Sequence, residues 1–253
     1  MTITLQTLSL IEKHRPTNLD GLLGNTALKR KFVEAYQESR IPNAILLHGG
    51  VGCGKTTAAY IIARMILCDT HDACGNCLPC RTVGKINASL PDYTHLDCAL
   101  EGTMDRIRAM VRISRYNPMF CRARVIVMDE VQELGGKHFK ALHGALEHTA
   151  PRTVWIFVTS DINDLPKTIR SRCMKFEFKP LLGSGGLLKR MAHICQEEGV
   201  DTELIDDDNS TQLFKRIINH HDGYVRECIM ALETVIPELK RGIAPRKLAL
   251  QFR

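Results

Sequence analysis

The sequence predicts an α/β fold in which a parallel sheet lies between helices, followed by a small all-helical domain. Three short runs of apolar residues have the length and the flanking residues of buried strands, at 44–47, 123–130 and 153–161. Segments of helical periodicity separate these runs. Strands that alternate with helices along a chain indicate a parallel sheet covered on both faces. The ligand of such a sheet binds at the carboxyl ends of its strands.

The predicted elements follow one another regularly. The run 44–47 ends in glycines and precedes "TTAAYIIARMIL", whose alanines and long apolar side chains are typical of a helix. Further helices are predicted at 103–116 and 136–148, where apolar residues recur at helical spacing. The run at 123–130 ends in two carboxylates, and the run at 153–161 ends in small hydroxylated residues.

The character of the sequence changes near residue 180. Pro180 and the glycine- and serine-rich run 183–186 predict a linker. Only helical patterns follow between Leu187 and Leu239. We therefore predict two domains, a nucleotide-binding domain at 1–180 and a small helical domain at 181–253.

The composition is that of an ordinary globular protein. Hydrophobic residues make up 44% of the 253 residues and charged residues 25%. The net charge of +6 permits binding to nucleic acid without requiring it. No apolar run approaches the roughly 18 residues of a membrane span, and the N-terminus has no basic leader ahead of its apolar stretch. We expect a cytoplasmic protein that does not contact a membrane.

The decamer "HGGVGCGKTT" at 48–57 lies between the first predicted strand and its helix. Gly49, four further residues and Gly54-Lys55-Thr56 form the G-x-x-x-x-G-K-[ST] pattern of a phosphate-binding loop. Its glycines turn backbone N–H groups towards phosphates, its lysine meets the β and γ oxygens, and its threonine hydroxyl ligates magnesium. The alternative, a chance match in a glycine-rich loop, is disfavoured by the strand and helix around it. The predicted nucleotide-binding residues are Gly49, Gly50, Val51, Gly52, Cys53, Gly54, Lys55, Thr56 and Thr57.

Asp129 and Glu130 end the second apolar run, where a buried charge is costly unless it has a role. Next to a phosphate loop, we expect Asp129 to be a second magnesium partner and Glu130 to orient an attacking water. The alternative is a strand end that reaches solvent, with both carboxylates hydrated. The pair predicts an ATPase rather than a protein that only holds a nucleotide.

Four of the ten cysteines gather in "CDTHDACGNCLPC", as Cys68, Cys74, Cys77 and Cys80. Four thiolates in so short a stretch can surround one tetrahedral zinc ion, which leaves no open position for chemistry. We therefore predict a structural zinc module at 68–80, in which His71 could replace one thiolate. The alternative is four free thiols on a loop. The remaining cysteines are dispersed and are expected to be small buried apolar residues.

The predicted helix at 103–116 carries a basic face. Successive helical residues advance by about 100°, so Arg108, Arg112 and Arg115 share one side of the helix. The other side is apolar. The basic face either is simply solvated or contacts the phosphates of duplex DNA without reading its sequence. The sequence leaves both interpretations open.

Together, "HGGVGCGKTT", "VIVMDEVQEL" and "FVTSDINDLPKTIRSRCMKFEFKPL" resemble the clamp-loader ATPases of the AAA+ superfamily. The motifs look most like those of gamma/tau subunits of bacterial DNA polymerase III, and next like replication factor C small subunits. "IEKHRPTNLDGLLGN" resembles the box that holds adenine in those proteins, and "GYVRE" at 223–227 resembles the start of a lid helix. The resemblance covers about residues 11 to 240, with the motifs in the family's order.

The resemblance implies roles for single residues. Ser160, with Thr159 beside it, matches a polar position that senses the γ-phosphate, and Arg172 in "SRC" matches a finger that acts in a neighbouring subunit's site. Arg226 in "GYVRE" matches an arginine that reaches the nucleotide from the lid. Surface ion pairs are the alternative for both arginines. The implied cofactors are ATP, Mg²⁺ and structural Zn²⁺. The implied partners are other clamp-loader subunits, alike or unlike, a sliding clamp and primer–template DNA.

The sequence also departs from the family's pattern. The collar domain that joins clamp-loader subunits would follow the lid, so we expect either a fragment or a naturally short relative. The stretch "ALEHTAPR" stands where the family commonly has Leu-Glu-Glu-Pro, and the first gap of the cysteine module is shorter than in gamma/tau subunits. Other functions are a branch-migration AAA+ motor, a structural subunit that does not hydrolyse ATP, and a small P-loop kinase. The kinase would need an acceptor site that no feature of the sequence marks.

Overall fold

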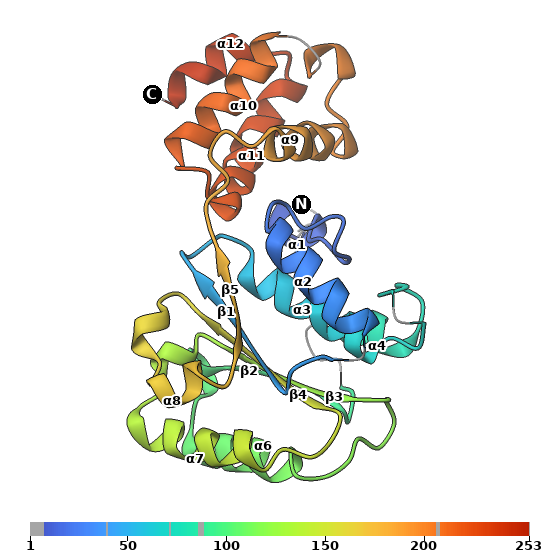
Figure 1. Ribbon diagram of the computed structural model, residues 1–253. Coiled ribbons are helices and arrows are strands. Elements are labelled where there is room, and N and C mark those ends of the chain that lie inside the picture. The colour runs from blue at the N-terminus through green and yellow to red at the C-terminus, as the bar shows by residue number, and fades with distance from the viewer. Residues whose placement is uncertain (1–7, 39, 71, 86–88, 206–207, 253) are drawn as a thin grey trace, which may run out of the picture. The chain divides into compact units, whose positions relative to one another are not determined.

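The computed structural model describes residues 8–38, 40–70, 72–85, 89–205 and 208–252 of the chain (Figure 1). Two compact units make up the structure. One consists of Thr17–Gly50 and Lys55–Phe178, and the other of Met1–Pro16, Val51–Gly54 and Lys179–Arg253. The division into domains 1–180 and 181–253 stays a prediction, because each unit joins stretches that lie far apart in the sequence.

A five-stranded parallel sheet forms the centre of the larger unit, in the order β2-β3-β4-β1-β5. The predicted strands are confirmed as β1, β3 and β4, each buried along most or all of its length. The edge strands β2 and β5 are less buried and did not stand out as apolar runs. The strands are β1 (Ala44–Gly49), β2 (Tyr93–Asp97), β3 (Arg124–Asp129), β4 (Thr153–Thr159) and β5 (Met174–Phe178).

Helices cover both faces of this sheet, as predicted (Figure 1). Helices α2 (Thr26–Gln37), α3 (Lys55–Leu67) and α4 (Leu78–Thr82) lie on one side. On the other side are α6 (Met104–Ile113), α7 (Gly136–Glu147) and α8 (Lys167–Arg170), while the short α5 (Cys98–Glu101) follows β2.

Alternation along the strands divides the core between the two faces. Side chains from β1, β3 and β4 pack against α6, α7 and α8 in one cluster, at whose centre Trp155 and Phe157 are almost fully buried. The side chains between them in the strands face α3, which is buried along most of its length. Burial on both faces explains why the three central strands are apolar along most of their length.

The smaller unit is helical in its C-terminal part, as predicted. It contains α9 (Gly185–Glu197), α10 (Asp208–His220), α11 (Val225–Lys240) and α12 (Pro245–Leu248) around a core of buried apolar side chains. The predicted linker at 183–186 is partly wrong, because Ser184 is the N-cap of α9 and two of the glycines form its first turn. Tertiary packing of the apolar face of α9 overrides the low helix propensity of glycine.

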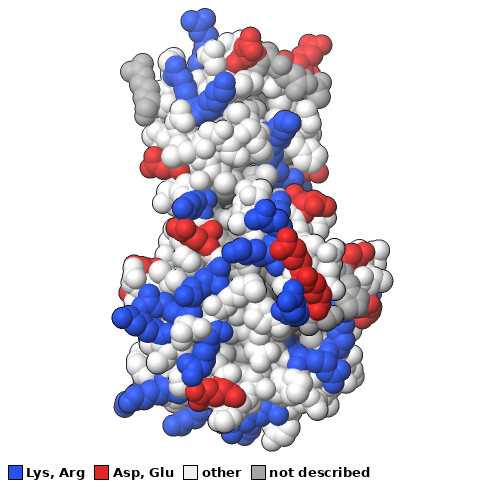
Figure 2. All heavy atoms as spheres, viewed as in Figure 1, with Lys and Arg blue, Asp and Glu red and all other residues white. Residues whose placement is uncertain are grey.

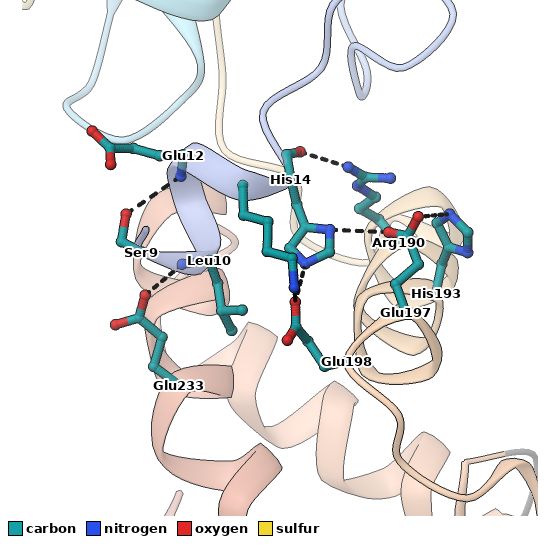
Figure 3. Close-up of polar contacts among 10 residues, drawn as sticks. Ser9, Leu10, Glu12, His14, Arg190, His193, Glu197, Glu198 and Glu233 are labelled. Carbon is teal, nitrogen blue, oxygen red and sulfur yellow. Dashed lines mark hydrogen bonds and ion pairs between the residues drawn. The ribbon is translucent and has the colours of Figure 1, made fainter. Parts of the chain in front are cut away.

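The N-terminal segment belongs to the same unit, and its short helix α1 (Leu10–Lys13) packs on α11 (Figure 3). The buried imidazole of His14 lies between two carboxylates at the C-terminal end of α9, with Nδ1 2.9 Å from Glu197 Oε2 and Nε2 2.6 Å from Glu198 Oε1. Lys13 Nζ lies 2.8 Å from the same Glu198 oxygen, and Arg190 donates to the His14 carbonyl. These contacts hold the first residues of "IEKHRPTNLDGLLGN", the stretch that resembles an adenine-binding box, against the helices of this unit.

No helix in the described ranges combines the length and the apolar character needed to cross a membrane.

Candidate nucleotide-binding site

The predicted phosphate loop joins the end of β1 at Gly49 to the start of α3 at Lys55, as its motif requires. Gly49 has a φ of +137°, and a Cβ built on it would lie 2.1 Å from the carbonyl oxygen of Phe178 in β5. Any other residue would therefore push β5 away from β1. The first glycine of the motif allows the loop to leave the sheet at its closely packed edge.

The side chain of Lys55 is buried against the loop itself. Its ammonium group donates to the carbonyl oxygens of Gly49 and Gly50, at 2.8 Å in each case. A buried cation needs such partners, because its desolvation is otherwise costly. The lysine is thus held in the loop that the motif predicts to bind phosphates.

Thr56 and Asp129 meet although 73 positions separate them in the sequence. The Thr56 hydroxyl donates to Asp129 Oδ2 at 2.8 Å, and the backbone N–H of Glu130 donates to Asp129 Oδ1 at 3.0 Å. Burial by itself raises the pKa of Asp129, but the interactions with His95, Thr56 and the Glu130 amide outweigh it and hold this pKa below its ordinary value. The result is an ionised carboxylate beside a hydroxyl oxygen, a donor set that suits Mg²⁺.

His95 was not predicted from the sequence. It lies on β2, its Nε2 is 3.9 Å from Asp129 Oδ2, and its ring is in an edge contact with Tyr60. The parallel pairing of β2 with β3 brings it to the carboxylate. A lone histidine in an edge strand gives no sequence signal of this position.

Glu130 is connected to the end of β4 through Gln132, which the sequence analysis also missed. The Gln132 amide group donates to the Glu130 carboxylate, while its Oε1 accepts from the Thr159 hydroxyl at 2.8 Å and from the backbone N–H of Ser160 at 3.3 Å. Glu130 has a φ of +50°, which is uncommon for a residue other than glycine, asparagine or aspartate. The buried hydroxyl in this network is that of Thr159, whereas Ser160 takes part through its backbone.

Arg172 lies just after α8, the helix on the same side of the sheet as α6 and α7. Its guanidinium donates to Glu147 Oε1 at 2.6 Å and to the carbonyl oxygen of Thr168 at 2.9 Å. The Arg172 side chain remains 36% exposed. Within one chain Arg172 therefore forms a surface ion pair, which was the alternative interpretation. Its predicted role as an arginine finger in a neighbouring subunit's nucleotide site stays a prediction.

Arg226 lies in the first turn of α11. Its backbone N–H donates to the carbonyl oxygen of Gly52 at 3.2 Å, and its side chain is exposed. Residues 51–54 of the phosphate loop and α11 belong to the same compact unit. Helix α11 and residues 51–54 are thus in direct contact within this unit, while the predicted role of the Arg226 side chain stays untested.

The four predicted zinc ligands come together at the end of α3. The sulfur atoms of Cys68, Cys74, Cys77 and Cys80 all lie within 4.8 Å of one another. Backbone N–H groups point at two of them, with Cys74 N 3.5 Å from Cys68 Sγ and Cys77 N 3.5 Å from Cys74 Sγ. His71, the alternative ligand, lies outside the described residues.

The environment favours thiolates at two of these positions. Burial alone raises the pKa of Cys68, but hydrogen bonds from Thr70 and the Cys74 backbone outweigh it and lower this pKa to about 6. Backbone hydrogen bonds from Cys77 and Asn76 also lower the pKa of Cys74. Burial raises the pKa of Cys80, so a cation is needed to hold all four sulfurs as thiolates. This donor set suits Zn²⁺.

The basic face of α6 is confirmed as exposed, with Ile107 and Met110 buried on the opposite side. The helix ends at Ile113, so Arg115 lies just beyond it. Figure 2 shows many Lys and Arg side chains over the region where Figure 1 places α6 and α7. A groove of about 470 Å³ between these helices is lined by Arg108, Val111, Arg112, Arg115, Tyr116, Lys140, Ala141 and Gly144.

Comparisons with known proteins show similarity to subunits of DNA polymerase III. A family model described as DNA polymerase III, delta subunit, matches residues 24–182. The DNA polymerase III subunit gamma/tau of Mycoplasma genitalium is 32% identical over 195 residues, which are 76% of this chain and 32% of that protein. The DNA polymerase III subunit gamma of Buchnera aphidicola subsp. Acyrthosiphon pisum is 29% identical over 230 residues, which are 90% of this chain and 61% of that protein. The chain thus spans between about a third and about three fifths of the length of these relatives.

Solved structures establish the fold. The RuvB Holliday junction branch migration motor of Thermotoga maritima superposes with a TM-score of 0.64 at 19% identity, over 94% of this chain and 71% of that one. The parallel sheet between helices and the helical C-terminal part therefore have the AAA+ P-loop fold. With the family model matching more than half of its length, the chain belongs to the DNA polymerase III, delta subunit family, and it is similar to gamma/tau subunits.

Proposed function

We propose that this protein is an ATP-hydrolysing subunit of a clamp loader, which couples ATP binding and hydrolysis to loading a sliding clamp on primed DNA. The observation that carries the proposal is the hydrogen bond between Thr56 of the phosphate loop and Asp129 at the end of β3, with Glu130 next to it. A protein that only bridged partners would not need this arrangement of a phosphate loop and an ionised carboxylate. Membership of a family of DNA polymerase III subunits supports the setting in DNA replication.

Each residue of the site has a role in this proposal. The glycine-rich loop and Lys55 bind the nucleotide's phosphates, and Thr56 and Asp129 hold Mg²⁺. Bound Mg²⁺ neutralises the charge of the phosphate oxygens. Glu130 orients the attacking water, and Gln132 keeps the Glu130 carboxylate in place.

Contacts from outside this centre complete the site. Polar groups at Thr159 and Ser160 sense the γ-phosphate, and Arg226 reaches the nucleotide from the lid. Arg172 of one subunit stabilises the charge that develops in the next subunit's site, where a fixed guanidinium contributes about a thousandfold or more in rate. A monomer should therefore hydrolyse ATP slowly.

Cys68, Cys74, Cys77 and Cys80 hold a structural zinc ion in this proposal. They lie close together, two of them are in surroundings that favour thiolates, and none contributes to the Thr56–Asp129 centre. Zinc would fasten the short α4 segment to the end of α3 and so stabilise the surface beside it.

The expected partners are other clamp-loader subunits, a sliding clamp and primer–template DNA. The cationic groove between α6 and α7 provides a surface for phosphates, with Arg108, Arg112, Arg115 and Lys140 along it. Contacts of this kind position a protein on DNA but do not read its sequence.

The remaining functions have less support. The likeness to RuvB is a likeness of fold and does not favour a branch-migration motor, since relatives in DNA polymerase III match the sequence better. Intact Lys55, Thr56, Asp129 and Glu130 disfavour a subunit that does not hydrolyse ATP. A small P-loop kinase stays without a marked acceptor site.

One experiment tests the proposal: the ATPase rate of the full chain with and without primed DNA and a sliding clamp. The native mass is measured alongside with a non-hydrolysable ATP analogue. Stimulation by both ligands and ATP-dependent assembly with clamp-loader subunits are expected. Lys55→Ala, which removes the cation of the loop, should abolish ATP binding and serves as the control. Phosphate transfer to a small acceptor, or a rate that neither ligand changes, would contradict a clamp loader.

The DNA surface is tested separately. Changing Arg108, Arg112 and Arg115 to Ala should weaken DNA binding regardless of sequence and reduce the slope of log affinity against log salt by up to about three. A matched triple change of the exposed Arg30, Lys31 and Arg40, which lie in and after α2, should leave the slope closer to that of the parent. An unchanged slope in the α6 variant would show that this face is simply solvated and does not contact DNA.

A further inference from the structure

One carboxylate lies where a phosphate-binding loop would be expected to exclude it. Glu227, in the first turn of α11, packs on the backbone of Gly52, at the centre of the phosphate loop. A Cβ built on Gly52 would be 2.5 Å from Glu227 Oε2 and 3.0 Å from Oε1. The neighbouring Arg226 N–H donates to the Gly52 carbonyl oxygen, which fixes this turn of the helix on the loop. The contact therefore depends on glycine at position 52.

The carboxylate gains little from this position. Its Oε2 is buried, and no donor among the described residues bonds to it. A buried acceptor without a partner costs free energy, and an ionised one costs more. Such a group in a folded protein calls for an explanation, and strain stored for a functional movement is one.

The electrostatic consequence follows from what the loop binds. A phosphate loop attracts polyanions through its backbone N–H groups and its lysine, whereas a fixed carboxylate on the same backbone repels them. If Glu227 kept its place, the phosphates of a nucleotide would have to bind beside a like charge.

We propose that Glu227 is an acidic gate of the phosphate loop. It rests on Gly52 in the arrangement seen here, disfavours nucleotide phosphates in that place, and leaves Gly52 when they bind. The inference rests on the proposed ATP binding and deepens it, because it assigns a regulatory residue to that site. On this proposal, the first turn of α11 moves when a nucleotide binds.

The geometry of α11 links the gate to Arg226. Adjacent helical residues point about 100° apart around the axis. A rotation or shift of the first turn that removes the Glu227 carboxylate from the loop therefore changes the direction of the Arg226 guanidinium as well. The Arg226 guanidinium can in this way take the place of the Glu227 carboxylate at the loop. Bound phosphates would then meet a positive charge there in place of a negative one.

Nucleotide binding by the full chain tests the gate. Glu227→Gln keeps the size of the side chain and removes its charge, so it should bind ATP about three- to tenfold more tightly than the parent. The gain should be smaller for ADP and absent for adenosine, because it depends on phosphate charge. Glu227→Asp keeps the charge and should stay close to the parent. Glu238→Gln, at the far end of α11, is the matched control and should change none of these affinities.

Two results would overturn the gate: ATP affinity that is unchanged or weaker in Glu227→Gln, and an equal gain for adenosine and ATP. Carbodiimide labelling of the parent chain, followed by mass spectrometry, gives a reading that needs no variant. Labelling of Glu227 should rise when ATP is added, and a constant or lower level would contradict its departure from Gly52. If the parent does not bind ATP at all, the proposed function itself fails, and the gate fails with it. If the parent binds ATP and Lys55→Ala does not, an unchanged Glu227→Gln contradicts the gate alone.

Discussion

At the scale of single residues, the candidate site is held together by short polar side chains that bridge neighbouring strands. Thr56 bonds to Asp129, and Gln132 joins the carboxylate of Glu130 to the hydroxyl of Thr159. Side chains that orient a catalytic carboxylate commonly affect the rate of reaction more than the affinity for substrate. The bridge by Gln132 can therefore be separated from nucleotide binding by experiment.

We expect Gln132→Ala to lower kcat for ATP hydrolysis by about 10- to 100-fold while the affinity for ATP changes by less than about twofold. Glu130→Gln should lose hydrolysis to a greater extent and still bind ATP. Steady-state kinetics and equilibrium binding distinguish the two parameters, with Gln37→Ala at the exposed end of α2 as the control. Equal turnover in Gln132→Ala and the parent would show that Glu130 does not need this partner.

Outside the candidate site, Asp92 also joins distant segments through its side chain, which is fully buried just before β2. Its carboxylate accepts hydrogen bonds from the backbone N–H groups of Met119, Phe120 and Cys121 and pairs with Arg124 at 2.8 Å. Burial raises its pKa, but these hydrogen bonds outweigh burial and hold the pKa below its ordinary value. The carboxylate thus fixes the loop between α6 and β3.

Asp92→Ala should lower the free energy of unfolding by about 3–5 kcal/mol, because it leaves Arg124 buried without its counter-ion. The stabilisation from a carboxylate with a lowered pKa is fully present above its unfolded-state pKa of about 3.9 and is lost as the pH falls through the folded value. The difference between variant and parent in urea denaturation should therefore shrink below about pH 4. Asp105→Ala, at an exposed carboxylate, should cost far less. A cost that is the same at every pH would exclude the charge as its source.

At the scale of elements, the cysteine module shows how a short segment can be fixed without a large core. Helix α4 has only five residues, and its Cys80 meets Cys68 from the end of α3 in one group of four sulfurs. A segment of this length gains little stability from its own hydrogen bonds. A metal ion that links Cys80 of α4 to Cys68 at the end of α3 would supply this missing stability.

The purified protein should therefore contain about one zinc ion per chain, and Cys77→Ser should lose it. Its melting temperature should fall by about 5 °C or more, while some ATP binding remains because the module lies outside the nucleotide site. Acid should release the metal as the thiolates become protonated. Elemental analysis and thermal denaturation measure these effects, with Cys121→Ser as a control outside the group. Protein purified without chelator that holds no metal and has four freely titratable thiols would contradict the module.

At the scale of the whole molecule, the open question is how one chain acts on the next. Arg172 is paired with Glu147 within its own chain, so it would have to exchange this partner for a nucleotide's phosphates in an assembly. Exposed ion pairs contribute only about 0–1 kcal/mol, and the exchange is therefore inexpensive. The surface ion pair does not prevent a finger, and mixing variants can test it.

Arg172→Ala should bind ATP but hydrolyse it slowly, and mixing it with Lys55→Ala protein should restore part of the activity. One variant then donates the arginine and the other the intact pocket. A mixture of Arg172→Ala with the double variant Lys55→Ala/Arg172→Ala supplies no arginine and is the control. The absence of recovery at every mixing ratio, with mixed oligomers shown by native mass, would count against action between subunits.

The sequence by itself determined the type of fold and the candidate residues of the site. Buried strands, amphipathic helices and the glycine-rich loop depend on local periodicity and local backbone requirements, so 44–47, 123–130 and 153–161 could be identified as strands without a structure. The cysteine group was predictable for the same reason, since its four members lie within one short segment.

Only the tertiary structure decided the contacts between segments that are distant in the sequence. The order of the strands brings His95 to Asp129 and the end of β4 to Gln132, and the packing of α11 on the loop brings Glu227 to Gly52. None of these residues stands in a pattern that marks its partner, because pairing across a sheet depends on strand order and register. A half-buried edge strand such as β2, moreover, has too weak an apolar pattern to be recognised alone. The residues proposed to carry the chemistry could therefore be identified from local sequence, whereas those proposed to orient and regulate it could be identified only from the fold.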